Sequence, residues 1–403
     1  MKVLSPFETY FLATSVYSVK SMPQKAIIRA YDSKEHLHFP GVKAPFDPAT
    51  LNAFKGRTGV RFTSQSLQFL TASTGFGFLA RQQSLGASEY VLVTRGTDMT
   101  PDWLSNLNVG VATGPSSKLV HAGFNDTFNS YRTQLETLLR QVGPPPAVIH
   151  CVGHSLGGAL ANLNAALLHE RGYTVCLYTL GAPRVGHYPF AKDLETKLKG
   201  RVYRVANRFD PVAMMPVFPY CHAAVKDDTY ITHAGGTLIN FEAHSTDPNK
   251  PGYAVPMNHP GKTWADLKQP MVRVGALNET LDDSIKILGT GLLFSGQLLV
   301  LIGQAIYKLC SKISQAALLT TQRFFEGCAE AMDRLAELLM ACATQSFIMK
   351  EEAKAIVGAI MKFLGRSSHV VADQLTVAVV RWALSQLTTE LQAKATLAIT
   401  RRY

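Results

Sequence analysis

The sequence lacks the patterns that mark metal-binding, disulfide-stapled and nucleic-acid-binding proteins. Its six cysteines form no Cys-x-x-Cys pair and no zinc-ligand spacing. Two of them, Cys151 and Cys176, lie inside apolar stretches, where a reduced cysteine acts as a small hydrophobic residue. The formal net charge is +11, yet no helix-turn-helix signal and no basic cluster interleaved with aromatic residues is present. We therefore expect reduced thiols and no metal, organic cofactor or nucleic-acid partner.

Charge is also scarce, and this excludes a disordered chain. Charged residues make up 17% of the sequence and hydrophobic residues 47%, a composition that builds a large core. The first eight residues include Pro6 and Glu8, where a signal peptide needs an unbroken apolar run. We therefore expect no signal peptide and a protein that is either cytoplasmic or exported by a signal-independent route, with action at a membrane left open.

Proline is absent after Pro270, and the composition changes near Gly275 from strands and turns to alanine- and leucine-rich helical sequence. This predicts an α/β domain over residues 1–274 and an all-helical C-terminal domain over residues 275–403. Amphipathic helices are expected near residues 314–343, 346–365 and 368–397. The uncharged stretch Ile287–Tyr307 has 21 residues, enough for a membrane span, but its glycines and polar residues also suit a packed helix.

Strands and helices alternate between about residues 75 and 206, which is typical of a largely parallel sheet with helices on its faces. The expected strands are Phe76–Arg81, Tyr90–Thr94, Ala147–Val152, Thr174–Leu180 and Arg201–Ala206. The expected helices are residues 7–20, Phe124–Leu139, a segment that ends near Gly172, and Tyr188–Leu198.

The run Gly153-His154-Ser155-Leu156-Gly157 falls between an expected strand and an expected helix, the context of a nucleophile elbow. In this tight turn the residues beside the serine must be small, and the serine hydroxyl projects from the end of the sheet. The N–H of Leu156 then points at the oxygen of a substrate carbonyl. We expect Ser155 to be a hydrolase nucleophile and Leu156 an oxyanion donor. The alternative is a glycine-rich helix start that only packs closely on a sheet.

A serine nucleophile needs a base, and the base needs an orienting acid; in this architecture both follow the serine in the chain. Asp210 comes just after an expected strand and before a proline, so we expect it to be the acid. The later histidines are His222, His233, His244 and His259. Expected strands at 229–231 and 237–241 put His233 in a turn, whereas His259 lies on a loop before an expected final helix. We favour His259 as the base, with His244 and His233 as alternatives.

Four runs of this sequence resemble the class 3 lipase family, the fungal-type lipases of the α/β-hydrolase superfamily. They are Thr94-Arg95-Gly96-Thr97 with Asp102-Trp103-Leu104, His121-Ala122-Gly123-Phe124, Gly153–Gly158, and Gly181-Ala182-Pro183-Arg184-Val185-Gly186. The resemblance covers about residues 70–270 and implies an α/β-hydrolase fold with a mostly parallel sheet.

The resemblance also implies roles for individual residues. It makes Ser155 the nucleophile, Asp210 the acid and Thr97 the second oxyanion donor. The family's His-Ala-Gly run resembles His233-Ala234-Gly235, and its histidine is not the catalytic one in that family, which favours His259. A short amphipathic lid is implied after Thr97. Its apolar face would consist of Met99, Trp103, Leu104 and Leu107.

Together these features predict a serine carboxylester hydrolase acting on lipid esters, as a triacylglycerol lipase or a phospholipase A-type enzyme. The family includes bacterial lipase effectors delivered into competitors, and a basic surface suits phospholipid headgroups. Two roles stay open for the helical tail: engagement of a membrane surface, or binding of a protein partner such as an inhibitor, a chaperone or a second copy. The alternative for the whole chain is a non-catalytic lipid-binding or protein-interaction module on a lipase scaffold.

Overall fold

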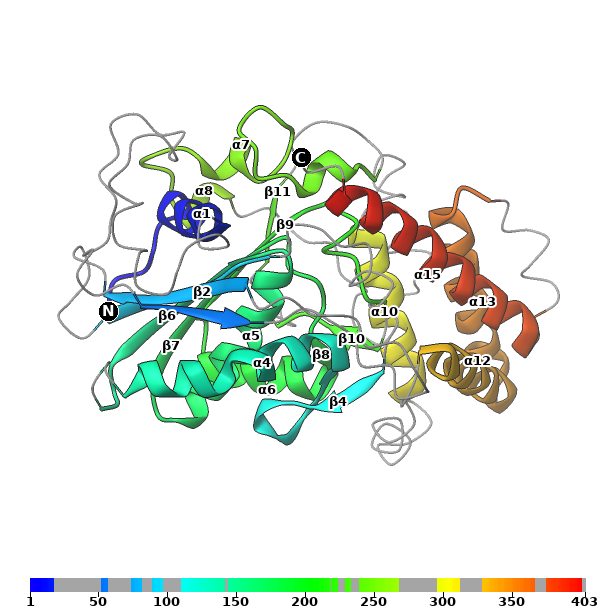
Figure 1. The fold of residues 1–403 in the computed structure, drawn as a ribbon. Coiled ribbons are helices and arrows are strands. Elements are labelled where there is room, and N and C mark those ends of the chain that lie inside the picture. Colours follow the sequence, from blue (N-terminus) through cyan, green and yellow to red (C-terminus); the bar gives the residue numbers. More distant parts are fainter. Residues whose placement is uncertain are drawn as a thin grey trace.

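The computed structural model describes most of the chain in two sheets, their covering helices and a C-terminal group of helices (Figure 1). The described residues are 1–17, 52–56, 74–81, 89–96, 110–140, 142, 144–217, 219–223, 229–232, 239–267, 296–311, 328–366 and 375–400.

The larger sheet has seven strands in the order β1-β2-β3-β6-β7-β9-β11. Their bounds are Asn52–Gly56 (β1), Thr74–Arg81 (β2), Glu89–Thr94 (β3), Val148–His154 (β6), Thr174–Leu180 (β7), Val202–Asn207 (β9) and Thr229–Thr232 (β11). The pairs β1–β2 and β2–β3 are antiparallel, and the five strands from β3 to β11 run parallel. The expected α/β-hydrolase fold with a mostly parallel sheet is therefore confirmed.

Helices cover both faces of this sheet (Figure 1). One face packs on α4 (Ala122–Leu139), α5 (Leu156–Glu170) and α6 (Tyr188–Leu198), and the other on α1 (Pro6–Ser15), α7 (Ala254–Met257) and α8 (Trp264–Leu267). Because successive strand residues point to opposite faces, neighbouring residues join different cores. Leu177 belongs to the α4–α5–α6 core and Tyr178 to the α1 core. Burial on both faces explains why these strands are almost continuously apolar.

A second, smaller sheet has the strand order β10-β8-β5-β4 and is antiparallel. Its strands are Val111–Thr113 (β4), Leu119–His121 (β5), Gly186–His187 (β8) and Tyr220–Cys221 (β10), with a 3₁₀ helix η4 at Pro115–Ser117 between β4 and β5. The His121 N–H donates to the Val185 carbonyl at 2.8 Å, so two of the runs that resemble the lipase family lie side by side here.

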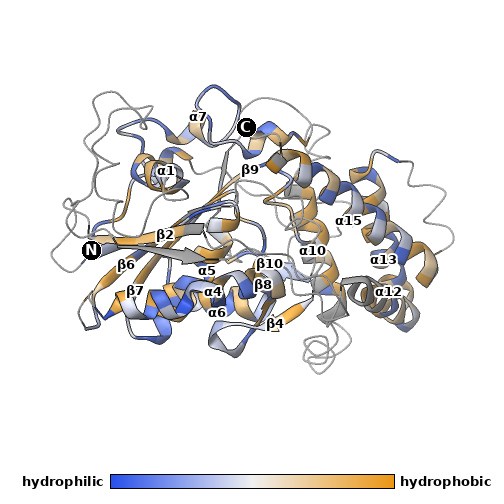
Figure 2. Cartoon of the chain, viewed as in Figure 1, coloured by the Kyte–Doolittle hydropathy of each residue, from blue (hydrophilic) through white to orange (hydrophobic). Residues whose placement is uncertain are grey.

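The C-terminal helices are α10 (Gly296–Ser311), α12 (Cys328–Gln345), α13 (Phe347–Phe363) and α15 (Val377–Thr400). Figure 2 shows many apolar residues along these helices, and their buried residues join the same core as α4 and α5. Helices are thus confirmed where the described residues overlap the three predicted tail segments. The predicted division at residues 274/275 falls outside the described residues and stays a prediction.

No helix within the described ranges is both long enough and apolar enough to cross a bilayer. Of the stretch Ile287–Tyr307, the part from Gly296 onward lies in α10, and the rest is outside those ranges.

Two predicted elements differ from those observed. The first helix was predicted over residues 7–20, but α1 ends at Ser15. The strand expected at 237–241 is also wrong at its end: Phe241–His244 forms a 3₁₀ helix, η5, which Asn240 begins with a side-chain cap.

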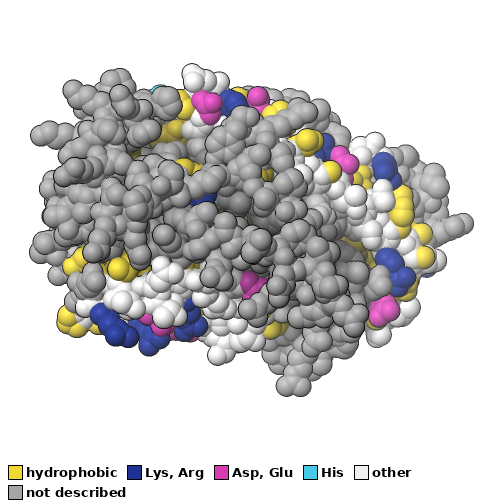
Figure 3. Space-filling view, in the orientation of Figure 1, with side chains coloured by type: hydrophobic (Ala, Val, Ile, Leu, Met, Phe, Trp, Pro, Cys, Tyr) yellow, Lys and Arg dark blue, Asp and Glu magenta, His cyan; other side chains and the backbone are white. Residues whose placement is uncertain are grey.

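Basic side chains gather on the described surface along the edge of α4 and α6 (Figure 3). Several of them are paired with acids. Glu136 lies 3.3 Å from Arg132 and 2.8 Å from Arg171, and Lys197 lies 2.7 Å from Asp193. Exposed pairs of this kind contribute little to stability, but they neutralise part of the positive charge.

Candidate active site

Ser155 occupies a strained turn between β6 and α5. Its backbone has φ 58° and ψ −132°, a region that residues with side chains rarely adopt. The turn is held by the Ser155 N–H, which donates to the Leu180 carbonyl at 2.9 Å. A Cβ on Gly153 would lie 2.1 Å from the Gly157 oxygen, and one on Gly157 would lie 2.1 Å from the Thr94 oxygen. Only glycine fits at these two positions, and the expected strand–turn–helix geometry is present.

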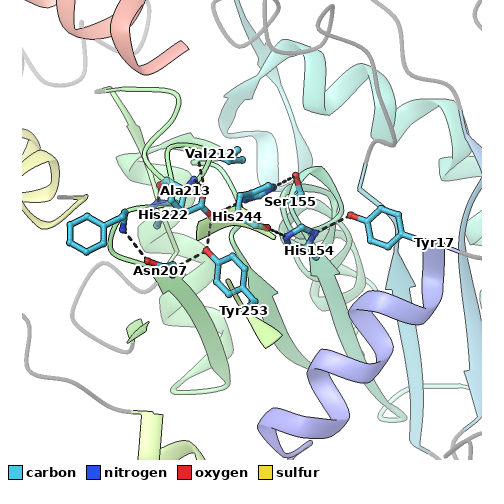
Figure 4. A network of polar contacts seen from close by, with 11 residues as sticks. Tyr17, His154, Ser155, Asn207, Val212, Ala213, His222, His244 and Tyr253 are labelled. Atoms are coloured by element: carbon cyan, nitrogen blue, oxygen red, sulfur yellow. Dashed lines mark hydrogen bonds and ion pairs between the residues drawn. The ribbon is translucent and has the colours of Figure 1, made fainter. Parts of the chain in front are cut away.

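A histidine lies beside this serine (Figure 4), and an aspartate lies on the other side of the histidine ring. The His244 Nε2 lies 2.9 Å from the Ser155 Oγ, and the His244 Nδ1 lies 2.8 Å from Asp210 Oδ2. All three side chains are buried. They come from three places in the fold: the β6–α5 turn, the end of η5 and the loop after β9. An imidazole bridging a hydroxyl and a carboxylate is arranged to take the hydroxyl proton and so to activate the serine oxygen.

His259 does not take part in this arrangement, so its expected position beside the serine is wrong. It is exposed, in a turn between α7 and α8 where its carbonyl accepts from the Lys262 N–H at 3.3 Å. His244 reaches the serine because η5 is bonded to the loop after β9 that carries Asp210, called the acid loop below. The Asn240 N–H donates to the Phe209 carbonyl in this loop at 3.1 Å. The third candidate, His233, lies outside the described residues.

Chain order alone could not separate the two histidines, because both follow Asp210. The signal near His244 is slight. Asn240 is a good helix cap, and its Oδ1 accepts from the Glu242 N–H at 2.9 Å, which starts the short helix that ends at His244.

Asp210 is held by donors on both carboxylate oxygens. Oδ1 accepts from the Val212 N–H at 2.8 Å, and Oδ2 accepts from the Tyr253 hydroxyl at 2.6 Å in addition to facing His244. The Tyr253 hydroxyl in turn accepts from the Asn207 N–H at 3.0 Å. Burial and the neighbouring Asp210 raise the pKa of Tyr253 well above its ordinary value, so the phenol stays protonated and donates. The sequence analysis did not single out Tyr253.

The acid loop is further anchored by the side chains of Arg184, which is buried, and His222, which is half-buried. Arg184 Nη1 donates to the Met214 carbonyl and, at 2.9 Å, to the Pro216 carbonyl. Burial lowers the pKa of Arg184 to about 10. The His222 Nε2 lies 2.8 Å from the Ala213 carbonyl, and burial keeps the pKa of His222 well below its ordinary value. The Gly-Ala-Pro-Arg run therefore supports the loop that carries Asp210.

His154, the residue before the serine, supports the base from the α1 side (Figure 4). Its Nδ1 lies 3.0 Å from the Tyr17 hydroxyl, and its Nε2 lies 3.1 Å from the His244 carbonyl. The His154 and His244 rings are 4.6 Å apart between centroids. These contacts fix the backbone of the base.

The expected oxyanion donors are described in part. Leu156 is the first residue of α5, so its N–H belongs to the helix start, where such groups have no intrahelical partner and favour negative charge. Thr97 lies outside the described residues, as does the predicted lid. Its neighbour Gly96 packs against the elbow: a Cβ there would lie 3.2 Å from the Ser155 Cβ. Among the residues with described positions, no group of three or more His, Cys, Asp or Glu side chains could hold a metal ion.

Comparison with known proteins finds a family match over the segment that carries the elbow and Asp210. Residues 91–220 match the class 3 lipase family. The match includes the elbow and Asp210 and covers about a third of the chain. It confirms the resemblance drawn from the four sequence runs.

Two curated relatives are similar to part of this chain. A secreted mono- and diacylglycerol lipase 1 of Fusarium solani is 34% identical over 142 residues, which cover 34% of this chain and 42% of the relative. The chloroplastic phospholipase A(1) DAD1 of Arabidopsis thaliana is 30% identical over 175 residues, which cover 36% of this chain and 39% of the relative. The chain therefore matches only about two fifths of the length of these relatives.

Among solved structures, a mutant form of MDLA from Penicillium cyclopium is similar at 23% identity and a TM-score of 0.40. The alignment covers 57% of this chain and 78% of that chain.

Proposed function

We propose that this protein is a serine carboxylester hydrolase acting on lipid esters. The observation that supports it best is the continuous contact from Ser155 through His244 to Asp210, with 2.9 Å and 2.8 Å between the partner atoms. The similarity to mono- and diacylglycerol lipases and to a phospholipase A1 supports a lipid ester as the substrate.

The geometry suits a two-step acyl transfer. The Ser155 Oγ attacks the ester carbonyl carbon while the His244 Nε2 takes its proton. Asp210 holds the opposite ring nitrogen, so that the imidazolium forms beside a carboxylate. The carbonyl oxygen becomes an oxyanion at the Leu156 N–H, with Thr97 as the proposed second donor. His244 then protonates the leaving alcohol. Water repeats the sequence on the acyl-serine and releases the fatty acid.

The test is the release of fatty acid from defined lipids. The wild-type chain is incubated separately with diacylglycerol, triacylglycerol and phosphatidylcholine dispersions, and Ser155→Ala is the matched control. We expect fatty acid from at least one lipid with the wild type and background release with Ser155→Ala. Equal release from both chains would contradict the proposal. Lipid binding by both chains with no release from either would favour a non-catalytic lipid-binding module.

We also propose that the C-terminal helices touch the lipid surface at the start of α13. Phe347 is 77% exposed and Ile348 is 68% exposed, and Lys350 beside them is exposed as well. Neighbouring bulky apolar side chains next to a lysine suit shallow insertion into an anionic bilayer. Flotation of Ser155→Ala with liposomes should fall when Phe347→Ser and Ile348→Ser are added. Unchanged flotation would contradict this contact, and a partner protein on the same residues would leave flotation low in both chains.

A further inference from the structure

The candidate base sits on an element too short to hold its own position. η5 is a single 3₁₀ turn of four residues, Phe241–His244. Isolated turns of this length are not stable, so the place of His244 depends on what packs around η5. On the inner side, η5 is attached to the acid loop through Asn240 and to Tyr253, whose N–H donates to the Ser245 carbonyl at 2.8 Å.

The outer support of η5 comes from the C-terminal helices. α15 packs directly against η5. Figure 1 places the carboxyl end of α15 near β9 and β11, the strands that precede the acid loop and η5, whereas its other end lies far out in the helical group. Ile239 and Phe241 pack on the core that includes the last buried residues of α15, Ala395, Ala398 and Ile399.

We infer that α15 is a positioning element for the base, holding η5 so that His244 stays in reach of Ser155 and Asp210. α15 lies well beyond the segment, residues 91–220, that matches the class 3 lipase family. The C-terminal helical region, which lies outside the family match, thus contributes to the active site by holding the base in place. A small displacement of a catalytic group is costly, since a shift of about 1 Å can reduce the rate about 10²-fold.

The test uses two equal truncations on one helix in the full chain. Ile399 is 3% exposed at the η5 end of α15, and Leu384 is 2% exposed toward the other end. Their positions are about 22 Å apart along the axis at 1.5 Å per residue. Both Ile399→Ala and Leu384→Ala remove a buried aliphatic side chain from the same packed helix. Ile399→Val is the milder variant, in case Ile399→Ala does not fold.

Two readouts are measured under conditions where each variant is folded. The first is the exchange of the backbone amides of residues 241–246 with deuterium, which requires no enzymatic activity. The second is kcat and KM for a soluble short-chain ester, which rests on the proposed function. For Ile399→Ala we expect faster exchange in this segment and a fall in kcat of about tenfold or more at a KM within about twofold, with Ile399→Val between it and the wild type. Leu384→Ala should keep both values near those of the wild type.

The outcomes separate the two proposals. If Ile399→Ala and Leu384→Ala change the 241–246 exchange and kcat equally, or neither changes them, α15 does not position the base. If the wild type hydrolyses no ester while exchange still rises only in Ile399→Ala, the positioning inference stands and the proposed function fails.

Discussion

Replacing His244 by alanine should abolish turnover, whereas the same change at His259 should leave it intact. His244 is 1% exposed and bridges Ser155 and Asp210 at 2.9 Å and 2.8 Å. Without it the serine proton loses its acceptor, and Asp210 keeps its bonds from the Val212 and Ala213 N–H groups and from the Tyr253 hydroxyl. Loss of a catalytic histidine from such an arrangement lowers kcat by about 10⁴–10⁶-fold, or about 5–8 kcal/mol of transition-state stabilisation.

The assay is kcat/KM on a soluble short-chain ester and on dispersed diacylglycerol, with urea unfolding to show that each variant is folded. His259→Ala is the matched control because that side chain is exposed in a turn. We expect it to stay within about twofold of the wild type, since surface substitutions seldom change the fold. A folded, active His244→Ala, or an inactive His259→Ala, would refute the assignment of the base.

Three further changes test the surroundings of the site. Tyr253→Phe removes the hydroxyl donor that lies 2.6 Å from Asp210 Oδ2, so the free energy of unfolding in urea should fall by about 1–3 kcal/mol and kcat should fall as well. An unchanged kcat would contradict the support of Asp210 by Tyr253. Gly157→Ala puts a Cβ 2.1 Å from the Thr94 oxygen and should yield little folded protein by circular dichroism, whereas Gly303→Ala in α10, with nothing within 4 Å, should fold normally. Burial lowers the pKa of His187 to about 4, so this histidine is neutral in the folded protein at pH 7. Between pH 6.5 and pH 4 the unfolded chain binds a proton at His187 that the folded protein does not, so the free energy of unfolding should fall by about 3 kcal/mol over this range. His187→Gln should flatten that pH dependence of unfolding, and an unchanged slope would contradict it.

Elements with a strong local pattern could be predicted from the sequence. β7 at Thr174–Leu180 and α6 at Tyr188–Leu198 have the predicted bounds, because an apolar strand flanked by turns and a helix closed by Gly200 are defined by neighbouring residues. The nucleophile elbow could also be predicted from neighbouring residues. Its glycines, its strand and its helix all lie within a short stretch around Ser155.

The partners of Ser155 depend on contacts between distant residues, and there prediction was less successful. Asp210 could be placed because it lies shortly after the end of β9 at Asn207. His244 could not, since its place results from the 3.1 Å bond between Asn240 and Phe209 and from the packing of α15. Tyr253 and Tyr17 contact the site from segments that carry no motif, at sequence separations of 43 residues from Asp210 and 137 from His154. The hydrophobic periodicity of a sequence predicts local helices and strands, and it does not predict contacts between residues so far apart in the chain.

The most direct test of the central claim is the reaction of the folded chain with a fluorophosphonate, followed by mass spectrometry of the modified peptide. Such reagents form a covalent bond with a serine oxygen that a neighbouring base has activated. The account predicts one modified residue, Ser155, with labelling that is lost in Ser155→Ala and strongly slowed in His244→Ala but not in His259→Ala. An unlabelled folded wild type, or equal labelling in His244→Ala, would contradict it.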